Sequence, residues 1–238
     1  IPDKNDPVYQ DAFSDRGDMV LLDYYKTNLM RVFGENWREK WETITSGQIR
    51  EFRLNTIANW SDLDYARKAQ IPYVLPLSGF PSTEVKLFRD FPDVFAAEYL
   101  ENAKQFATQL KNFKGDPYLI GYFLRNEPHW AFGSHDIAYE MFATLQLSES
   151  KHTFARWLST QYPNIGEFNK NWNLELESFE ALTRQTFEEY PSEKAKEDFW
   201  QFSEILVKQY VDVPCDEVEK VDPDHLNLGM RYAWISSD

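Results

Sequence analysis

The stretch from Tyr118 to Trp130, which reads YLIGYFLRNEPHW, decides the fold. Its first half is a short apolar run, the pattern of a strand buried on both faces of a parallel sheet. The run ends in Asn126 and Glu127, followed by a proline and two aromatic rings. A carboxylate at the end of a buried strand is costly to desolvate unless something uses it. Because barrels of alternating strands and helices carry their chemistry at such strand ends, Glu127 is a candidate catalytic acid. A helix cap is the structural alternative.

The composition favours a neutral substrate. The 238 residues can form one sizeable core, and the length suits a single α/β barrel or part of something larger. A formal net charge of -14 argues against nucleic acid and against an anionic membrane surface as partners. Eight Trp and 13 Tyr can serve as stacking platforms for sugars, although most aromatic rings are expected in the core.

The sequence predicts no metal and no disulfide. Cys215 is the only cysteine, and the four histidines lack the spacing of zinc ligands. No apolar run reaches membrane-spanning length, and the N-terminus lacks the pattern of a signal peptide. No oligomeric state is predicted.

Four strands are predicted, separated by long helical segments. Residues 1–18 are expected to form a polar surface arm, followed by a helix from about Met19 to Gly34. A long helix near the C-terminus is expected to kink at Pro214. Ser61 or Asp62 is expected to cap a short helix. The four strands are Leu54 to Trp60, Ile71 to Leu77, Tyr118 to Leu124 and Leu226 to Trp234, and the clearest amphipathic helix runs from Phe95 to Phe113 with Pro92 near its first turn.

This alternation predicts an α/β fold with a parallel sheet and right-handed crossovers. A closed barrel of this type needs eight strands, and only four are found. The prediction is therefore part of a (β/α)8 TIM barrel with long helical βα segments. Residues 1–238 are expected to form one partial barrel with no internal domain boundary.

Several segments resemble one family of enzymes. Gly121 to Pro128 resembles the fourth-strand motif of the large clan of retaining (β/α)8 glycoside hydrolases, in which the Asn-Glu pair holds the general acid/base. Asn55 to Asp62 is similar to the second-strand motif of β-agarases of glycoside hydrolase family fifty. Asn28 to Trp41 resembles the helical lead-in to that strand. Phe154 to Trp172 resembles the segment after the acid/base strand in agarases and bacterial β-galactosidases, and His225 to Ala233 their fifth-strand region.

The resemblance implies a retaining glycoside hydrolase that acts on β-galactosidic linkages in agarose or a related algal galactan, without a cofactor. It places the chain at about strands two to five of the barrel. It also implies a secreted or periplasmic location. Such hydrolysis needs two carboxyl groups that flank the scissile bond, and Glu127 is expected to be the general acid/base. The expected substrate-binding residues are Asn126, Asn59, Trp60, His129, Trp130, Arg231 and Trp234.

For two of these residues a structural role is also open. Arg231 is either a sugar contact or the partner of a buried carboxylate, and Trp234 is either a stacking platform or part of the core. Asn59-Trp60-Ser61 matches the glycosylation acceptor pattern, but a strand end that faces a site would hide it.

The chain departs from the family pattern at two points. Arg125 stands where the agarases usually have an acidic residue. The clan's nucleophile is a Glu at the end of the seventh strand, whereas every Glu from Glu140 to Glu219 lies in a polar, helix-like stretch. The nucleophile is therefore expected beyond Asp238, in a longer enzyme. Alternatives are another clan glycosidase (β-galactosidase, β-glucanase or β-mannanase) or a carbohydrate-binding relative without catalysis.

Overall fold

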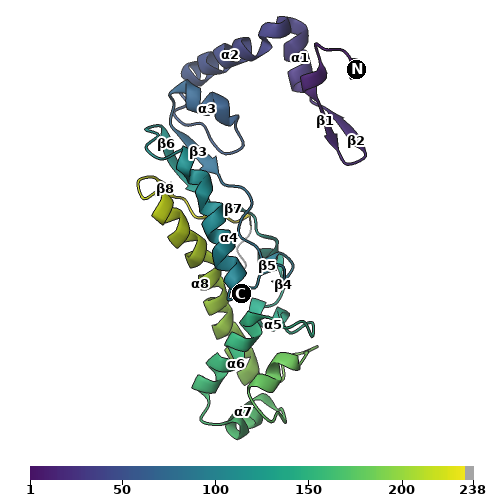
Figure 1. Ribbon diagram of the computed structural model, residues 1–238, viewed down its shortest axis with the longest axis vertical. Coiled ribbons are helices and arrows are strands. Elements are labelled where there is room, and N and C mark those ends of the chain that lie inside the picture. The colour runs from purple at the N-terminus through teal and green to yellow at the C-terminus, as the bar shows by residue number, and fades with distance from the viewer. Residues whose placement is uncertain (234–238) are drawn as a thin grey trace. The chain divides into compact units, whose positions relative to one another are not determined.

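The computed structural model describes residues 1–233. The chain divides into two compact units, Ile1–Tyr73 and Val74–Asp238, and each is described by itself. Figure 1 labels the α-helices and most of the strands, and its colours follow the chain from the N-terminus to the C-terminus.

The first unit begins with a short hairpin where the sequence predicted a polar arm and the start of a helix. After the 3-10 turn η1 (Gln10–Ala12), strands β1 (Phe13–Arg16) and β2 (Met19–Leu22) pair antiparallel around Gly17, whose φ is 60°. The helix starts later than predicted because the carboxylate of Asp23 accepts the backbone N–H of Lys26 and so caps α1 (Tyr24–Phe33). Gly34 ends α1 with a φ of 58°, as predicted.

Two further helices complete this unit. The turn η2 (Gly34–Asn36) leads into α2 (Trp37–Glu51), and α3 (Leu63–Ala69) follows. Asp62 caps α3 by accepting the backbone N–H of Tyr65 at 2.8 Å, which confirms the predicted cap. The same carboxylate forms a bidentate ion pair with Arg38 of α2. The strand predicted over Leu54 to Trp60 is reduced to a single parallel bridge between Ile57 and Tyr73.

The second unit contains the central sheet. Strands β3 (Tyr73–Pro76), β6 (Leu119–Phe123) and β8 (Leu226–Asn227) are neighbours in that order, and β6 and β8 are parallel. Beyond them, β7 (Arg125–Asn126) pairs parallel with β9 (Met230–Arg231). The predicted last strand is thus two short strands, separated at Gly229 with a φ of 74°.

Helices are the most abundant elements of the second unit. A short hairpin of β4 (Lys86–Phe88) and β5 (Phe91–Pro92) precedes α4 (Ala97–Ala107), so Pro92 lies in a strand and not in the helix's first turn. The other helices are η3 (Thr108–Asn112), η4 (His129–Phe132), α5 (Ile137–Glu140), α6 (Glu149–Gln161), α7 (Ile165–Trp172), η5 (Glu180–Arg184) and α8 (Glu193–Val221). The long helix α8 continues through Pro214.

The core of the second unit is largely aromatic. Phe199 and Phe202 of α8 are fully buried and pack against Phe154 of α6, with ring centroids 5.3 and 4.7 Å apart. Helices α4 and α8 lie side by side (Figure 1), and the hydroxyl of Tyr99 donates to the backbone oxygen of Tyr210 at 2.7 Å. Rings of this size provide most of the apolar area that stabilises such a core.

The combination of helices with parallel strand pairs confirms the α/β class. Closure into a (β/α)8 barrel and the single-domain assignment of residues 1–238 stay predictions. Among the helices of residues 1–233, none combines the length and the apolar composition that crossing a membrane requires.

Candidate functional site

Glu127 lies where the paired strands β7 and β9 end. Its backbone N–H donates to the carbonyl oxygen of Arg231 at 2.8 Å, which continues the β7–β9 pairing by one residue. Its φ of 43° lies in the left-handed region, which costs a residue with a side chain of order 1 kcal/mol or more. Pro128 follows with a φ of -60°, and the chain turns at once into η4. The strand end thus presents Glu127 on a sharp, strained turn.

Three of the predicted site residues converge here. The guanidinium of Arg231 donates to the side-chain oxygen of Asn126 at 2.9 Å and forms an ion pair with the carboxylate of Glu127. The register of β7 and β9 places Asn126 directly opposite Arg231. The Glu127 side chain is 36% exposed, so the carboxylate is open to a ligand. Of the two roles considered for Arg231, partner of a carboxylate is the one that the contacts support.

His129 and Trp130 follow on η4 and face different surroundings. His129 is exposed. The Trp130 ring is half-buried and meets Phe91, Tyr210 and Tyr232 edge-on, with centroids 5.2, 5.3 and 6.3 Å away. Its contacts are those of a core residue at the edge of the site, and a role as sugar platform stays a prediction.

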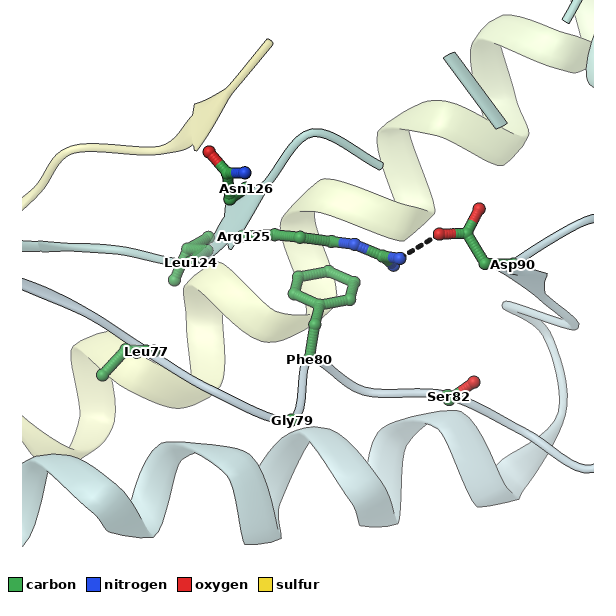
Figure 2. Close-up of a pocket in the computed structure, with 8 residues that line it drawn as sticks. All are labelled: Leu77, Gly79, Phe80, Ser82, Asp90, Leu124, Arg125 and Asn126. Carbon is green, nitrogen blue, oxygen red and sulfur yellow. Dashed lines mark hydrogen bonds and ion pairs between the residues drawn. The ribbon is translucent and has the colours of Figure 1, made fainter. Parts of the chain in front are cut away.

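Arg125 and Asp90 form an ion pair that the sequence did not predict. Figure 2 shows the Arg125 side chain reaching across the ring of Phe80 to Asp90, with the guanidinium 5.2 Å from the ring centroid. Arg125 also donates to the hydroxyl of Tyr210 at 2.8 Å. Burial raises the pKa of Tyr210 above its usual range, so this hydroxyl keeps its proton.

The sequence contained one indication of this ion pair. A positive charge just after a buried strand needs a partner, and Arg125 is such a charge. The chain has 39 acidic residues, however, and nothing local to Arg125 selects Asp90, which lies 35 positions earlier. Only the folded hairpin of β4 and β5 brings the two together.

A pocket of about 260 Å³ lies beside the ion pair, at the C-terminal ends of β3 and β6. Figure 2 shows the residues that line it besides Arg125 and Asp90, namely Leu77, Gly79, Phe80, Ser82, Leu124 and Asn126. An aromatic ring, a hydroxyl, an amide and a charge pair around one pocket match the mixed apolar and polar surface of a small polar ligand such as a sugar.

The other predicted residues lie elsewhere. Asn59 and Trp60 belong to the first unit, so a cleft shared with Glu127 stays a prediction. Trp60 is 66% exposed and has a φ of 64°. The side-chain oxygen of Asn59 is buried and accepts no hydrogen bond from residues 1–233. Trp234 lies outside the described residues.

A metal centre is not found in the described part of the chain. Across residues 1–233, no group of three or more His, Cys, Asp or Glu side chains is arranged to hold an ion. What the arrangement offers instead is a carboxylate beside an amide and a guanidinium, on an open turn next to a polar pocket. Such a set can bind hydroxyl groups and transfer a proton.

Curated relatives of this chain are agarases. It is 26% identical over 235 residues to β-agarase B of Vibrio sp. (strain JT0107), covering 90% of this chain and 24% of that protein. It is also 26% identical to β-agarase A of the same strain, over 89% of this chain and 23% of that protein. The chain therefore spans about a quarter of the length of these relatives. No family model matches.

Solved structures agree on the fold. The chain is similar to the agarase AgWH50C with a TM-score of 0.82 at 23% identity, over 98% of this chain and 36% of that one. An exo-β-agarase gives a TM-score of 0.80, and PfGH50B gives 0.81, each again at 23% identity and with 98% of this chain covered. These two matches span 35% and 37% of the solved chains. The expected resemblance to the β-agarases of glycoside hydrolase family fifty is confirmed.

Proposed function

Because the chain is homologous to β-agarases and shares its fold with solved agarases, we propose that it is part of a glycoside hydrolase that cleaves β-galactosidic linkages in agarose or a related algal galactan. The mechanism is retaining, and Glu127 is the general acid/base. The strands belong to a (β/α)8 barrel, and the enzyme works outside the cytoplasm on a neutral polysaccharide.

The main structural support for this proposal is the arrangement of Asn126, Glu127 and Arg231 at the strand end. A general acid must reach the glycosidic oxygen, and the partly exposed carboxylate of Glu127 stands on a turn that projects it from the strand end. Arg231 restricts the carboxylate to one orientation through their ion pair. Asn126 lies next to the same guanidinium, where its amide can donate to a sugar hydroxyl.

The proposed mechanism also requires a second carboxylate. Retaining hydrolysis needs a nucleophile about 5–5.5 Å from the acid/base. From Glu140 to Glu219, every Glu lies on a helix or a loop and none ends a strand of this sheet. We therefore assign the nucleophile to another part of the enzyme.

A substrate panel tests the proposal. The full-length protein is incubated with agarose, porphyran, lactose and a β-glucan, and the first anomer released is identified by proton NMR. Cleavage of a galactan with retention of configuration is the expected result. Preference for lactose or the β-glucan would favour another glycosidase of the clan. Binding of agarose without cleavage would favour a carbohydrate-binding relative.

A further inference from the structure

Asp90 is tied to the chain on both sides of Glu127. One of its carboxylate oxygens pairs with the Arg125 guanidinium and accepts the backbone N–H of His129 at 3.0 Å. The other oxygen accepts the backbone N–H of Trp130 at 2.9 Å. The contacts thus come from two residues before Glu127 and from two and three residues after it. A single carboxylate bridges the strained turn that carries the candidate acid.

The position of Asp90 is itself fixed by the core. Asp90 and Arg89 form the two-residue turn between the paired residues Phe88 and Phe91. Phe91 is fully buried and stacks on Tyr210 with ring centroids 4.9 Å apart. Arg89 has a φ of 49° and donates to the carbonyl oxygen of His129 at 3.1 Å. The side chains of this turn therefore bind both N–H and C=O groups of the η4 backbone.

Arg125 connects this turn to the long helix α8. Its guanidinium donates to Tyr210 of α8 as well as to Asp90, and its side chain is only 19% exposed. The Asp90 side chain is 25% exposed. A charge pair this sheltered from water holds its geometry more firmly than an exposed one, because solvent screens it less.

We propose that Asp90 and Arg125 are a positioning pair for Glu127, which goes beyond assigning the acid and rests on the proposed function. Neither side chain needs to touch the reacting atoms. Asp90 fixes the backbone on which Glu127 stands, and Arg125 holds Asp90 in place. Since a displacement of about 1 Å in a reacting group can cost on the order of 10²-fold in rate, a pair of this kind affects catalysis strongly.

The carboxylate is the required group at position 90. Its two oxygens accept from three donors, and an ionised carboxylate offers acceptors only. In Asp90→Asn one oxygen becomes an NH₂ group, which faces at least one of those donors. This substitution therefore removes at least one of the three contacts of Asp90 while keeping the shape of the side chain.

The test compares two substrates in the full-length enzyme. Cleavage of a galactan oligosaccharide requires protonation of the departing sugar oxygen. An activated aryl galactoside does not, because its acidic phenol departs as the phenolate. In Asp90→Asn and in Arg125→Met, kcat on the oligosaccharide is expected to fall about 10- to 100-fold. The value of kcat/KM for the aryl galactoside is expected to stay within about twofold, because its first step does not need the acid. The double variant is expected to lose little beyond either single one.

A matched control separates this role from general loss of structure. Asp136→Asn removes another partly buried carboxylate, which accepts hydrogen bonds from Tyr139, Tyr190 and Ser203. The rates on both substrates are expected to stay unchanged in this variant. Amide exchange of the peptide 126–132 is followed on the same samples. It is expected to become faster in Asp90→Asn and to stay unchanged in Asp136→Asn.

The outcomes distinguish the two proposals. Equal losses on both substrates, or unchanged rates and exchange in Asp90→Asn, would overturn the positioning role while leaving Glu127 as the acid. A wild-type protein that cleaves neither substrate would overturn the proposed function, and the positioning role with it.

Discussion

Arg231 contacts Glu127 twice, through its side chain and through its backbone. Its guanidinium pairs with the Glu127 carboxylate, and its carbonyl oxygen accepts the Glu127 N–H at 2.8 Å. The second contact belongs to the pairing of β7 and β9 and is independent of the Arg231 side chain. A substitution at position 231 therefore removes the orientation of the carboxylate while the strand end stays in place.

We expect Arg231→Met to lower kcat on a galactan oligosaccharide about 10- to 100-fold with little change in stability. The rate falls because the carboxylate loses its fixed orientation. Stability changes by less than about 1 kcal/mol, since the two side chains are 45% and 36% exposed and such ion pairs contribute little. Steady-state kinetics and urea denaturation measure the two effects. Arg156→Met, which removes an exposed arginine on α6, is the control. A decrease in unfolding free energy well above about 1 kcal/mol would contradict this assignment, because the ion pair would then be mainly structural.

The central strand and its Glu could be predicted because their signals are local. An apolar run that ends in Asn-Glu-Pro defines both the strand and the turn, and Asp62 and Gly34 are recognised as cap residues by chemistry alone. The hairpin at Met19–Leu22 was missed because four apolar residues fit a strand and a helix equally well.

The connection through Asp90 could not be predicted from the sequence. Arg125 shows that a carboxylate is needed, but its partner lies in a hairpin whose position depends on Phe91 packing into the core. The split of the last strand has a similar origin, since Gly229 has a φ of 74° between β8, which pairs with β6, and β9, which pairs with β7. Both features arise from contacts between distant segments.

Gly121 should not tolerate a side chain. A Cβ at this position would lie 2.2 Å from the backbone oxygen of Leu226, its partner on β8. We expect Gly121→Ala to separate β6 from β8 and to destabilise the protein by about 1–3 kcal/mol, measured by urea denaturation and by amide exchange of both strands. Gly47→Ala is the control, because Gly47 lies inside α2 with open space around it and should gain up to about 1 kcal/mol. Equal stability of the two variants would refute the close approach.

His225 is expected to stabilise the protein at acidic pH. Its Nε2 lies 2.9 Å from the carbonyl oxygen of Asp116 and its Nδ1 lies 2.7 Å from the carboxylate of Asp222, and only the imidazolium form can donate to both of these acceptors. Burial alone would lower the pKa of His225, but the two hydrogen bonds outweigh it and raise the pKa. A raised pKa in the folded state gives stability that is present below the unfolded pKa of about 6.5 and is lost as pH rises through the folded pKa.

The comparison is between the wild type and His225→Gln. The difference in their unfolding free energies, measured from pH 5 to pH 9, should be largest at the acidic end and shrink as the imidazolium loses its proton. A difference that is constant with pH would mean that His225 is neutral in the folded protein.

Lys151 should have the opposite dependence on pH. It is 1% exposed, its ammonium donates to the carbonyl oxygen of Thr144 at 2.6 Å, and burial lowers its pKa to about 8. The unfolded chain therefore binds more protons between pH 8 and about 10.5, so the stability of the wild type should rise over that interval by up to about 3 kcal/mol. Lys151→Met lacks this titration, and the rise should be absent from its unfolding free energy. A rise of equal size in both proteins would show that another group causes it.

Glu127→Gln is the most direct test of the acid/base assignment. The amide keeps the size of the side chain but has no proton to transfer, so polysaccharide turnover should fall by at least about 10²–10⁴-fold. An activated aryl galactoside should still form the glycosyl-enzyme intermediate, which then accumulates because water has lost its general base. Azide needs no base, so added azide should restore turnover and give a glycosyl azide of retained configuration, identified by NMR. Near wild-type hydrolysis of the polysaccharide would make Glu127 a structural carboxylate. An azide product of inverted configuration would instead identify Glu127 as the nucleophile, because azide would then attack the anomeric carbon directly, in a single displacement, in place of the missing carboxylate.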